Sequence, residues 1–240
     1  DIDIFTTTLT AKKGVLFPNT EFATFFYNYD DKRDCTQRPD NVCPTCCHAD
    51  IDVQMYGGHV LGINDWGPGQ LDTLLWGGVQ TGDWYELDHN AHAIAGEIGY
   101  QFTQVSWKPW FRTGYFLGSG DSNPSDGDHE TFFQMAPGTR KYQLYPYYDL
   151  QNNRDFFVQL ITKPTSKLTA RMDYHIVQLD ESGDRWYMGT GPTQKSGQIS
   201  GYIPRACGGH DALSQDFGIM LRYALNTQCK IVAFYDHVWG

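Results

Sequence analysis

Charged and apolar side chains alternate along one segment of the chain, and this spacing limits the chemistry that they can do. In an extended strand successive side chains point to opposite faces, so the charged residues between Lys167 and Ile176 share one face. These residues are Lys167, Arg171, Asp173 and His175. A row of opposed charges on a wetted surface selects polar solutes without a covalent step. The pattern suits a soluble β-sandwich as well as the water-filled side of a membrane barrel.

The same alternation places further charges on the polar faces of their strands. Acids and bases are mixed there, so two interpretations stay open: they select a passing solute, or they only neutralise one another inside a barrel. The candidate lumen and solute-binding residues are Glu97, Arg112, Lys167, Arg171, Asp173, His175 and Arg222, and Asp216, Lys230 and Asp236 are placed on the same side.

Four cysteines crowd one short segment, which is typical of an oxidising compartment. We expect disulfides among Cys35, Cys43, Cys46 and Cys47 to staple an external loop, with a pairing that the sequence leaves open. A zinc site with His48 is a second interpretation, but Cys43-x-x-Cys46 lacks a matching second pair. Haem attachment is least favoured, because Cys47 stands where the motif C-x-x-C-H has histidine. The cysteines without evident partners are Cys207 and Cys229.

An acidic segment offers the carboxylates that Ca²⁺ prefers. Its acids are Asp121, Asp126, Asp128 and Glu130. Counted from Asp121, position six is Asp126 where an EF-hand has glycine, and position twelve is Phe132 where it has glutamate. We therefore favour an ordinary solvated loop over a calcium site, and we predict no metal or other cofactor.

Composition and motifs argue against two classes of function. The eight histidines form no H-E-x-x-H motif, and no G-x-S-x-G motif occurs. The formal net charge is −10, from 18 basic and 28 acidic residues, and the basic residues are scattered along the chain. Binding to phosphates needs a concentrated basic surface. We therefore predict neither an enzyme nor a nucleic-acid partner.

Periodicity predicts an all-β fold. No run of about 18 apolar residues occurs, which argues against a transmembrane helix, whereas a barrel strand crosses with about 9–11 residues whose outward face alone is apolar. We predict one antiparallel β-barrel domain over residues 1–240, with about ten strands. They are expected near residues 1–10, 20–29, 48–61, 70–81, 91–104, 108–119, 153–163, 166–178, 214–225 and 228–238.

The connections between these strands alternate in length. Residues 104–107, 163–166 and 225–228 are expected to be tight turns, whereas 120–152 and 180–213 are long and rich in Gly, Asp, Ser and Pro. Short turns at one end and long loops at the other are typical of outer-membrane barrels, with the turns in the periplasm. The aromatic residues that suit interfacial girdles are Tyr100, Phe102, Trp107, Trp110, Tyr223, Tyr235 and Trp239.

Several segments also occur in a recognisable order. They are 96–102 (GEIGYQF), 107–115 (WKPWFRTGY), 119–121 (SGD), 123–127 (NPSDG), 153–155 (NRD), 163–165 (KPT), 171–175 (RMDYH) and 184–187 (DRWY). In this order they resemble the alginate export family of bacterial outer-membrane barrels, mainly over residues 70–240.

The resemblance implies a porin-like channel in the bacterial outer membrane, within a larger barrel of about 16–18 strands. This chain is then expected to lack the first strands and the closing strand. The implied partners are the lipid bilayer, lipopolysaccharide and a polar or anionic solute such as a polysaccharide, attracted by Arg112, Arg171 and Arg222. The alternatives are a surface-assembly barrel whose Cys-rich loop binds a partner, and, less favoured, a barrel hydrolase.

Overall fold

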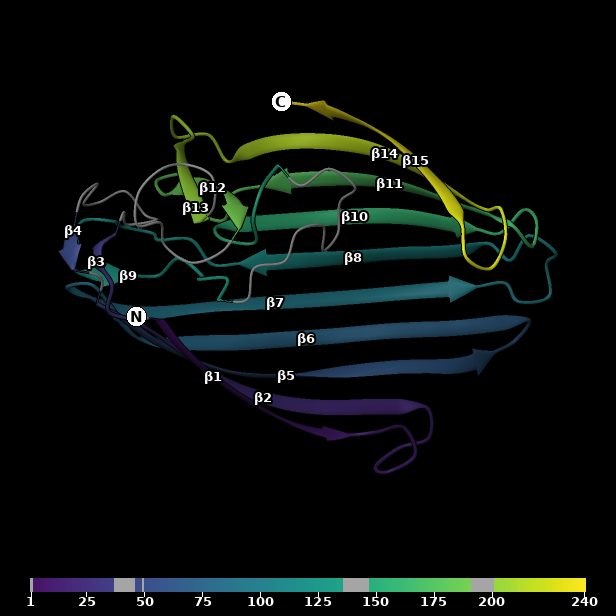
Figure 1. The fold of residues 1–240 in the computed structure, drawn as a ribbon, viewed down its shortest axis with the longest axis horizontal. Coiled ribbons are helices and arrows are strands. Elements are labelled where there is room, and N and C mark those ends of the chain that lie inside the picture. The colour runs from purple at the N-terminus through teal and green to yellow at the C-terminus, as the bar shows by residue number, and fades with distance from the viewer. Residues whose placement is uncertain (1, 37–45, 49, 136–146, 191–200) are drawn as a thin grey trace.

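The dominant feature of the fold is an eleven-stranded sheet, shown in Figure 1. The computed structural model describes residues 2–36, 46–48, 50–135, 147–190 and 201–240. Ten strands form one antiparallel path in chain order, and they confirm the ten predicted strands. Their bounds are β1 (Ile2–Ala11), β2 (Thr20–Asp31), β5 (Ile51–Trp66), β6 (Gly69–Trp84), β7 (Leu87–Gln101), β8 (Trp110–Gly118), β10 (Asn153–Thr162), β11 (Leu168–Gln178), β14 (Ala212–Ala224) and β15 (Lys230–Trp239).

Five short strands lie in the connections and were not predicted. They are β3 (Asp34–Thr36), β4 (Cys46–His48), β9 (Asp128–His129), β12 (Arg185–Thr190) and β13 (Gly201–Ala206). Two pairs, β3–β4 and β12–β13, form small sheets of their own, and β9 joins β7 in parallel. The strands β3, β4 and β9 have only two or three residues each, too few to show a periodic pattern.

The connections divide the molecule into two unlike ends (Figure 1). Residues 12–19, 67–68, 102–109, 163–167 and 225–229 connect neighbouring strands at one end, here called the turn end. The described parts of the long connections 32–50, 119–152 and 179–211 lie at the other, the loop end, together with the tight turn at 85–86. This confirms the asymmetry that is typical of outer-membrane barrels.

The two faces of the sheet differ as the alternation predicts. On the outer face large apolar side chains stay exposed, including Leu75 (63%), Val79 (53%), Ile94 (49%), Ile98 (49%), Phe111 (51%) and Val158 (44%). The inner face carries the charged residues and most of the small ones together with the buried apolar core, and described residues of the connection after β8 cover part of it. An apolar surface of this extent suits lipid contact.

The buried core lies on the inner face. Ile51 and Val53 of β5 and Ala93 of β7 pack in one cluster with Phe132 and Phe133, which come from the connection after β8. Apolar side chains of a connection can leave water only by packing on another apolar surface. The segment 128–135 therefore folds back over the inner face and narrows the space beside it.

The sheet has two edges among the described strands, since β1 and β15 each pair on one side only. The side chains of both strands are largely exposed. In the described part of the chain, no helix is long and apolar enough to span a membrane.

Candidate functional site

The inner face of the sheet carries a continuous row of charged and amide side chains. Register pairing aligns Asp72 of β6, Gly99 of β7, Arg112 of β8, Gln159 of β10 and Asp173 of β11 side by side. Glu97 and Arg171 lie beside this line on the same face. We call Asp72, Glu97, Arg112, Gln159, Arg171 and Asp173 the charge row.

Arg112 is the centre of the charge row. Its guanidinium forms an ion pair with Glu97 on the neighbouring strand, and its Nε lies 3.5 Å from Asp72 Oδ1. A Cβ atom at Gly99 would lie 2.4 Å from Asp72 Oδ2 and 2.8 Å from Arg112 Cγ. The absence of a side chain at Gly99 therefore lets the arginine reach an acid two strands away.

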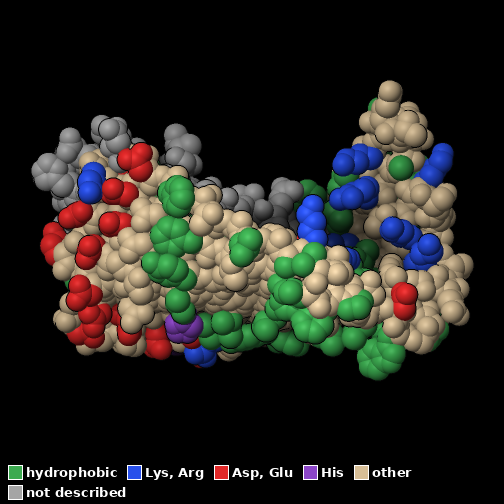
Figure 2. Space-filling model, turned by 90° about the horizontal axis from the view of Figure 1, so that it is seen from below, with side chains coloured by type: hydrophobic (Ala, Val, Ile, Leu, Met, Phe, Trp, Pro, Cys, Tyr) green, Lys and Arg blue, Asp and Glu red, His purple; other side chains and the backbone are tan. Residues whose placement is uncertain are grey.

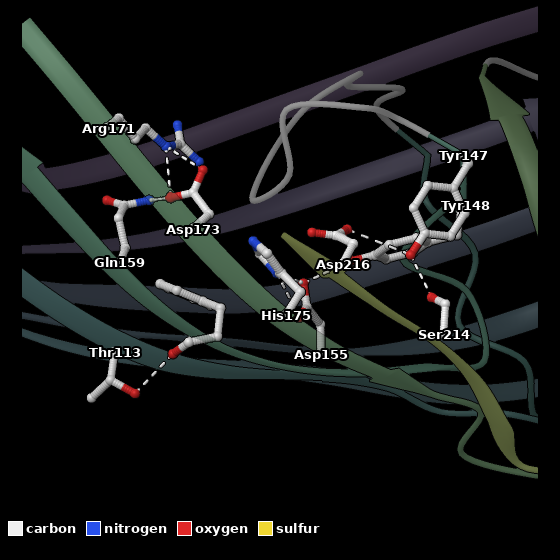
Figure 3. Close-up of polar contacts among 11 residues, drawn as sticks. Thr113, Tyr147, Tyr148, Asp155, Gln159, Arg171, Asp173, His175, Ser214 and Asp216 are labelled. Atoms are coloured by element: carbon white, nitrogen blue, oxygen red, sulfur yellow. Dashed lines mark hydrogen bonds and ion pairs between the residues drawn. The ribbon is translucent and has the colours of Figure 1, made fainter. Parts of the chain in front are cut away.

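Gln159 continues the row by linking Arg112 to a second ion pair. It accepts a hydrogen bond from Arg112 Nη1 at 3.3 Å and donates one to Asp173 Oδ1 at 2.7 Å. Arg171 Nε in turn donates to Asp173 Oδ2 at 2.7 Å. Donors and acceptors alternate across the five strands of the row, so each charge lies beside an opposite or amide partner. Figure 3 shows the end of the row at Gln159, Asp173 and Arg171.

A second group of polar contacts ties a connection to the wall nearer the loop end (Figure 3). His175 of β11 and Asp155 of β10 are completely buried, with His175 Nδ1 2.9 Å from Asp155 Oδ1. The hydroxyl of Tyr148 donates to Asp155 Oδ2 at 2.6 Å, and burial, followed by the negative charge of Asp155, raises the pKa of Tyr148. Tyr147 lies within hydrogen-bond distance of Ser214 on β14. The connection before β10 is thus bonded directly to β10 and β14, and through Asp155 to His175 of β11.

Two further predicted lumen residues, Lys167 and Arg222, lie at the turn end with Lys230, apart from the charge row. Asp216 and Asp236 instead lie toward the loop end, where Asp216 is buried 3.5 Å from the Tyr147 hydroxyl. Lys167 and Arg222 are exposed, and no ion pair is found for them among the described residues. Arg222 is paired with Thr169 of β11 and with Val232 of β15, so its side chain lies on the same face of the sheet as Arg171. The structure therefore places Glu97, Arg112, Arg171 and Asp173 in contact within one row, whereas Lys167 and Arg222 form a separate basic region.

Charge is distributed very unevenly between the two ends (Figure 2). The five turns contain no aspartate or glutamate, and their bases are Lys12, Lys13, Lys108, Lys163 and Lys167, with Arg222 and Lys230 in the adjoining strands. The described acids of the long connections are Asp50, Asp121, Asp126, Asp128, Glu130, Asp149, Asp180, Glu181, Asp184 and Asp211. In Figure 2 the acids gather at the loop end on the left and the bases at the turn end on the right.

The acidic connection differs in part from the solvated loop that we expected. Asp126 and Asp128 are exposed, but Asp121 and Asp184 are buried, with 4% and 5% of their surface exposed. Burial raises the pKa of Asp121 to about 6, and the Asp184 carboxylate adds to this shift. Burial also raises the pKa of Asp184, which accepts hydrogen bonds from the Asp121 backbone N–H and the Thr131 hydroxyl. These two acids thus hold connections together.

No group of three or more His, Cys, Asp or Glu side chains that could hold a metal ion is found in the described part of the chain. Two of the acids considered as calcium ligands bond within their own loop: Asp121 Oδ1 accepts from the Asn123 N–H, and Glu130 Oε2 accepts from the Ser122 hydroxyl. The buried position of Asp121 was missed, because sequence shows a run of acids without showing what folds over it.

The cysteine predictions lie mostly outside the described side chains. Cys43 and the side chains of Cys35, Cys46 and Cys47 are not described, so the predicted disulfides stay a prediction. Cys207 and Cys229 are free thiols. Cys207 Sγ lies 2.9 Å from the Ser182 carbonyl at the loop end, whereas Cys229 is exposed in a turn at the opposite end.

Two features of the inner face have no counterpart in the sequence predictions. Trp110, expected in an interfacial girdle, points inward instead: its indole donates to Asp72 Oδ2 at 2.6 Å, and Arg112 lies 4.8 Å above its ring. A buried cluster also joins Trp84 and His89 to His129 of β9, with His129 stacked on Trp84 at 4.3 Å between ring centroids. The sequence did carry a signal for the inward position of Trp110. Trp110 lies two residues before Arg112 on the same strand, so alternation places both side chains on one face.

Comparison with known proteins agrees with this architecture. A family model described as alginate export matches residues 19–239, nearly the whole chain. No curated protein was found to match the chain significantly. Proteins of this family are transport channels of the bacterial outer membrane built as β-barrels. An antiparallel sheet with an apolar outer face, a charged inner face and short turns opposite long loops has the architecture that such a channel needs. The chain belongs to the alginate export family.

Proposed function

We propose that this sheet forms part of the wall of a channel through which an anionic polysaccharide crosses the outer membrane, entering at the turn end. The observation that carries the proposal is the charge of that end, where three of the five turns contribute five lysines and none of the five contains an acid. Charges of one sign at a channel mouth raise the local concentration of solutes of the opposite sign. The basic turn end would therefore collect a polyanion from the periplasm.

The charge row supports passage rather than tight binding. Its acids and bases are paired within the wall, so a charged solute that passes them meets a nearly balanced surface. A conducting site must attract a solute enough to admit it and weakly enough to release it. The arginines of the row can exchange partners with a passing carboxylate, which suits transient contact.

The segment 128–135 and the tyrosines before β10 would narrow the loop end. Both are fixed to the inner face by buried hydrogen bonds, among them the bond from Tyr148 to Asp155. We propose that this narrowing sets the size of solute that passes.

A closed wall requires neighbours for both sheet edges. Each unpaired backbone polar group in hydrocarbon costs on the order of several kcal/mol, so β1 and β15 each need a neighbouring strand in a membrane wall. We propose that further strands pair with both edges, and that lipid and lipopolysaccharide contact the outer face.

The test is a planar-bilayer recording of the detergent-purified full-length protein under a salt gradient. Stable conductance with anion preference is expected, and oligogalacturonate added on the turn side should block more often than on the loop side. Lys167→Gln with Arg222→Gln should reduce the rate of block from the turn side, whereas Lys32→Gln at the loop end serves as the matched control. Cation preference would overturn the anionic solute, and folded protein without conductance would overturn the channel itself.

A further inference from the structure

An apolar pocket of about 660 Å³ lies on the inner face, separate from the charge row. Its lining includes the aromatic side chains of Phe25, Tyr27, Trp76, Phe116 and Phe132. We call these five residues and the space between them the aromatic pocket. Four of them come from strands of the wall and Phe132 comes from the segment after β8. Lipid contact accounts for apolar side chains on the outer face of the sheet. It does not account for an aromatic pocket on the inner face, so this pocket needs another explanation.

Small residues in the wall let the rings of this pocket lie flat. A Cβ atom at Gly57 would lie 2.4 Å from the Phe25 ring, so the ring occupies the place of a side chain there. Phe25 stacks on Trp76 with 5.9 Å between ring centroids and an angle of 19° between planes. Phe25 and Trp76 are only partly buried and both line the pocket, so part of each ring remains exposed to it.

Polar groups stand at the margin of the same pocket. Glu21, His59 and Gln134 belong to its lining, and Glu21 Oε1 lies 3.3 Å from His59 Nε2. The Glu21 and His59 side chains are about 30% and 28% exposed, so both remain open to a ligand. The pocket thus combines apolar ring faces with hydrogen-bonding groups at the edge, whereas a site for an acyl chain needs only the former.

We propose that the aromatic pocket is a carbohydrate subsite that holds one sugar ring of the passing polysaccharide; this inference rests on the proposed function. A pyranose ring has a face of C–H groups and a rim of hydroxyls. Aromatic faces carry negative charge density and attract weakly positive C–H groups. The flat rings of Phe25 and Trp76 match the face of the sugar, and Glu21, His59 and Gln134 match its hydroxyls.

This subsite recognises the sugar ring and not its charge. No lysine or arginine lines the aromatic pocket among the described residues. A neutral saccharide should therefore bind there, although it would gain nothing from the basic turn end or from the charge row. That separates the subsite from the electrostatic part of the channel.

The experiment measures binding of maltohexaose, a neutral saccharide, to the full-length protein by calorimetry in a detergent without a sugar headgroup. Trp76→Ala and Phe25→Ala should each weaken binding about tenfold, and Trp76→Phe should retain most of it. Phe26→Ala is the matched control, because Phe26 is the next residue of β2 and packs on the outer face against Tyr56. Near-UV circular dichroism and heat-shifted electrophoretic mobility would verify that each variant is folded.

Equal affinity in all folded variants, or no binding of maltohexaose by the wild-type protein, would overturn the subsite. Channel recordings on the same preparations separate this failure from that of the proposed function. A conducting, anion-preferring channel that binds no neutral saccharide would leave the function standing without the subsite. Saccharide binding that depends on Trp76 would support the subsite even in protein that conducts no ions.

Discussion

The side-chain amide of Gln80 on β6 bonds to both backbone polar groups of Phe133: Nε2 donates to the carbonyl at 2.6 Å and Oε1 accepts from the N–H at 2.8 Å. Both residues are buried. The amide therefore replaces the hydrogen bonds that a neighbouring strand would give to this segment. Together with the pairing of β9 and β7, it links the segment 128–135 directly to the barrel wall.

Replacing Gln80 by leucine should loosen this segment. Two buried backbone groups of Phe133 would lose their partners, at a cost on the order of 2 kcal/mol for the packed state. We expect noisier single-channel currents and a higher mean conductance. Gln70→Leu is the control on the same strand, because Gln70 is at the turn end and its side chain bonds only to Asp65 among the described contacts. Unchanged recordings for Gln80→Leu would show that the segment does not narrow the channel.

Removing either charge of the Arg112–Glu97 pair should change the ion selectivity of the channel, in opposite directions. Arg112→Met leaves the carboxylates of Glu97 and Asp72 uncompensated and should shift the permeability ratio toward cations, on the order of twofold. Glu97→Gln should shift it toward anions. Reversal potentials under a salt gradient measure both, and in 1 M salt, where screening acts within about 3 Å, the differences should shrink. Shifts of the same sign in the two variants would contradict the assignment.

Asp121 should make the packing of the loop end depend on pH. Its pKa is raised by burial from the model-compound value of 3.8 to about 6, so the folded protein holds more protons than the unfolded chain between about pH 4 and 6. The free energy of unfolding from this group is therefore greatest at low pH and falls as pH rises through 6. The two-unit shift bounds the effect at about 3 kcal/mol.

The comparison of wild-type protein with Asp121→Asn isolates this effect from other titrating groups. Asparagine stays neutral and can still accept the hydrogen bond from the Asn123 N–H. At pH 7.5 the variant should resist urea better than the wild type, and at pH 4 the difference should vanish. A variant that is less stable at pH 7.5 would mean that the buried carboxylate is needed as an anion.

Glycine should be required at position 57 for the stability of the folded protein, whereas position 96 should tolerate a side chain. A Cβ atom at Gly57 would lie 2.3 Å from the carbonyl oxygen of Gly77, which is backbone and cannot rotate away, while nothing lies within 4 Å at Gly96. Gly57→Ala should cost about 1–3 kcal/mol, and Gly96→Ala should be neutral or slightly stabilising. Urea titrations of refolded protein in liposomes measure both. Equal losses would show that the wall yields around Gly57.

The sequence by itself determined the strands, their faces and their connections. A two-residue period assigns each side chain to a face once a strand is recognised. Every strand that faces lipid needs an apolar outer face, so the same pattern recurs in each strand. The segment 166–178 shows this: Asp173 and His175 face inward and Ile176 remains exposed, as the alternation predicts. The inward positions of Arg112 and Arg171 follow from the same rule.

Only the tertiary structure decided which inward side chains meet and what covers them. The ion pair of Arg112 with Asp72 depends on a register across three strands and on the bare backbone of Gly99. The burial of Asp121 and the bond from Tyr148 to Asp155 depend on long connections folding back over the wall. Connections have no period that the sequence can display, and their packing is set by contacts between residues far apart in the chain. The strands of the wall can thus be predicted from short stretches of sequence, because the same alternation repeats in each. The contacts among the inward side chains form only when the sheet and its connections pack together.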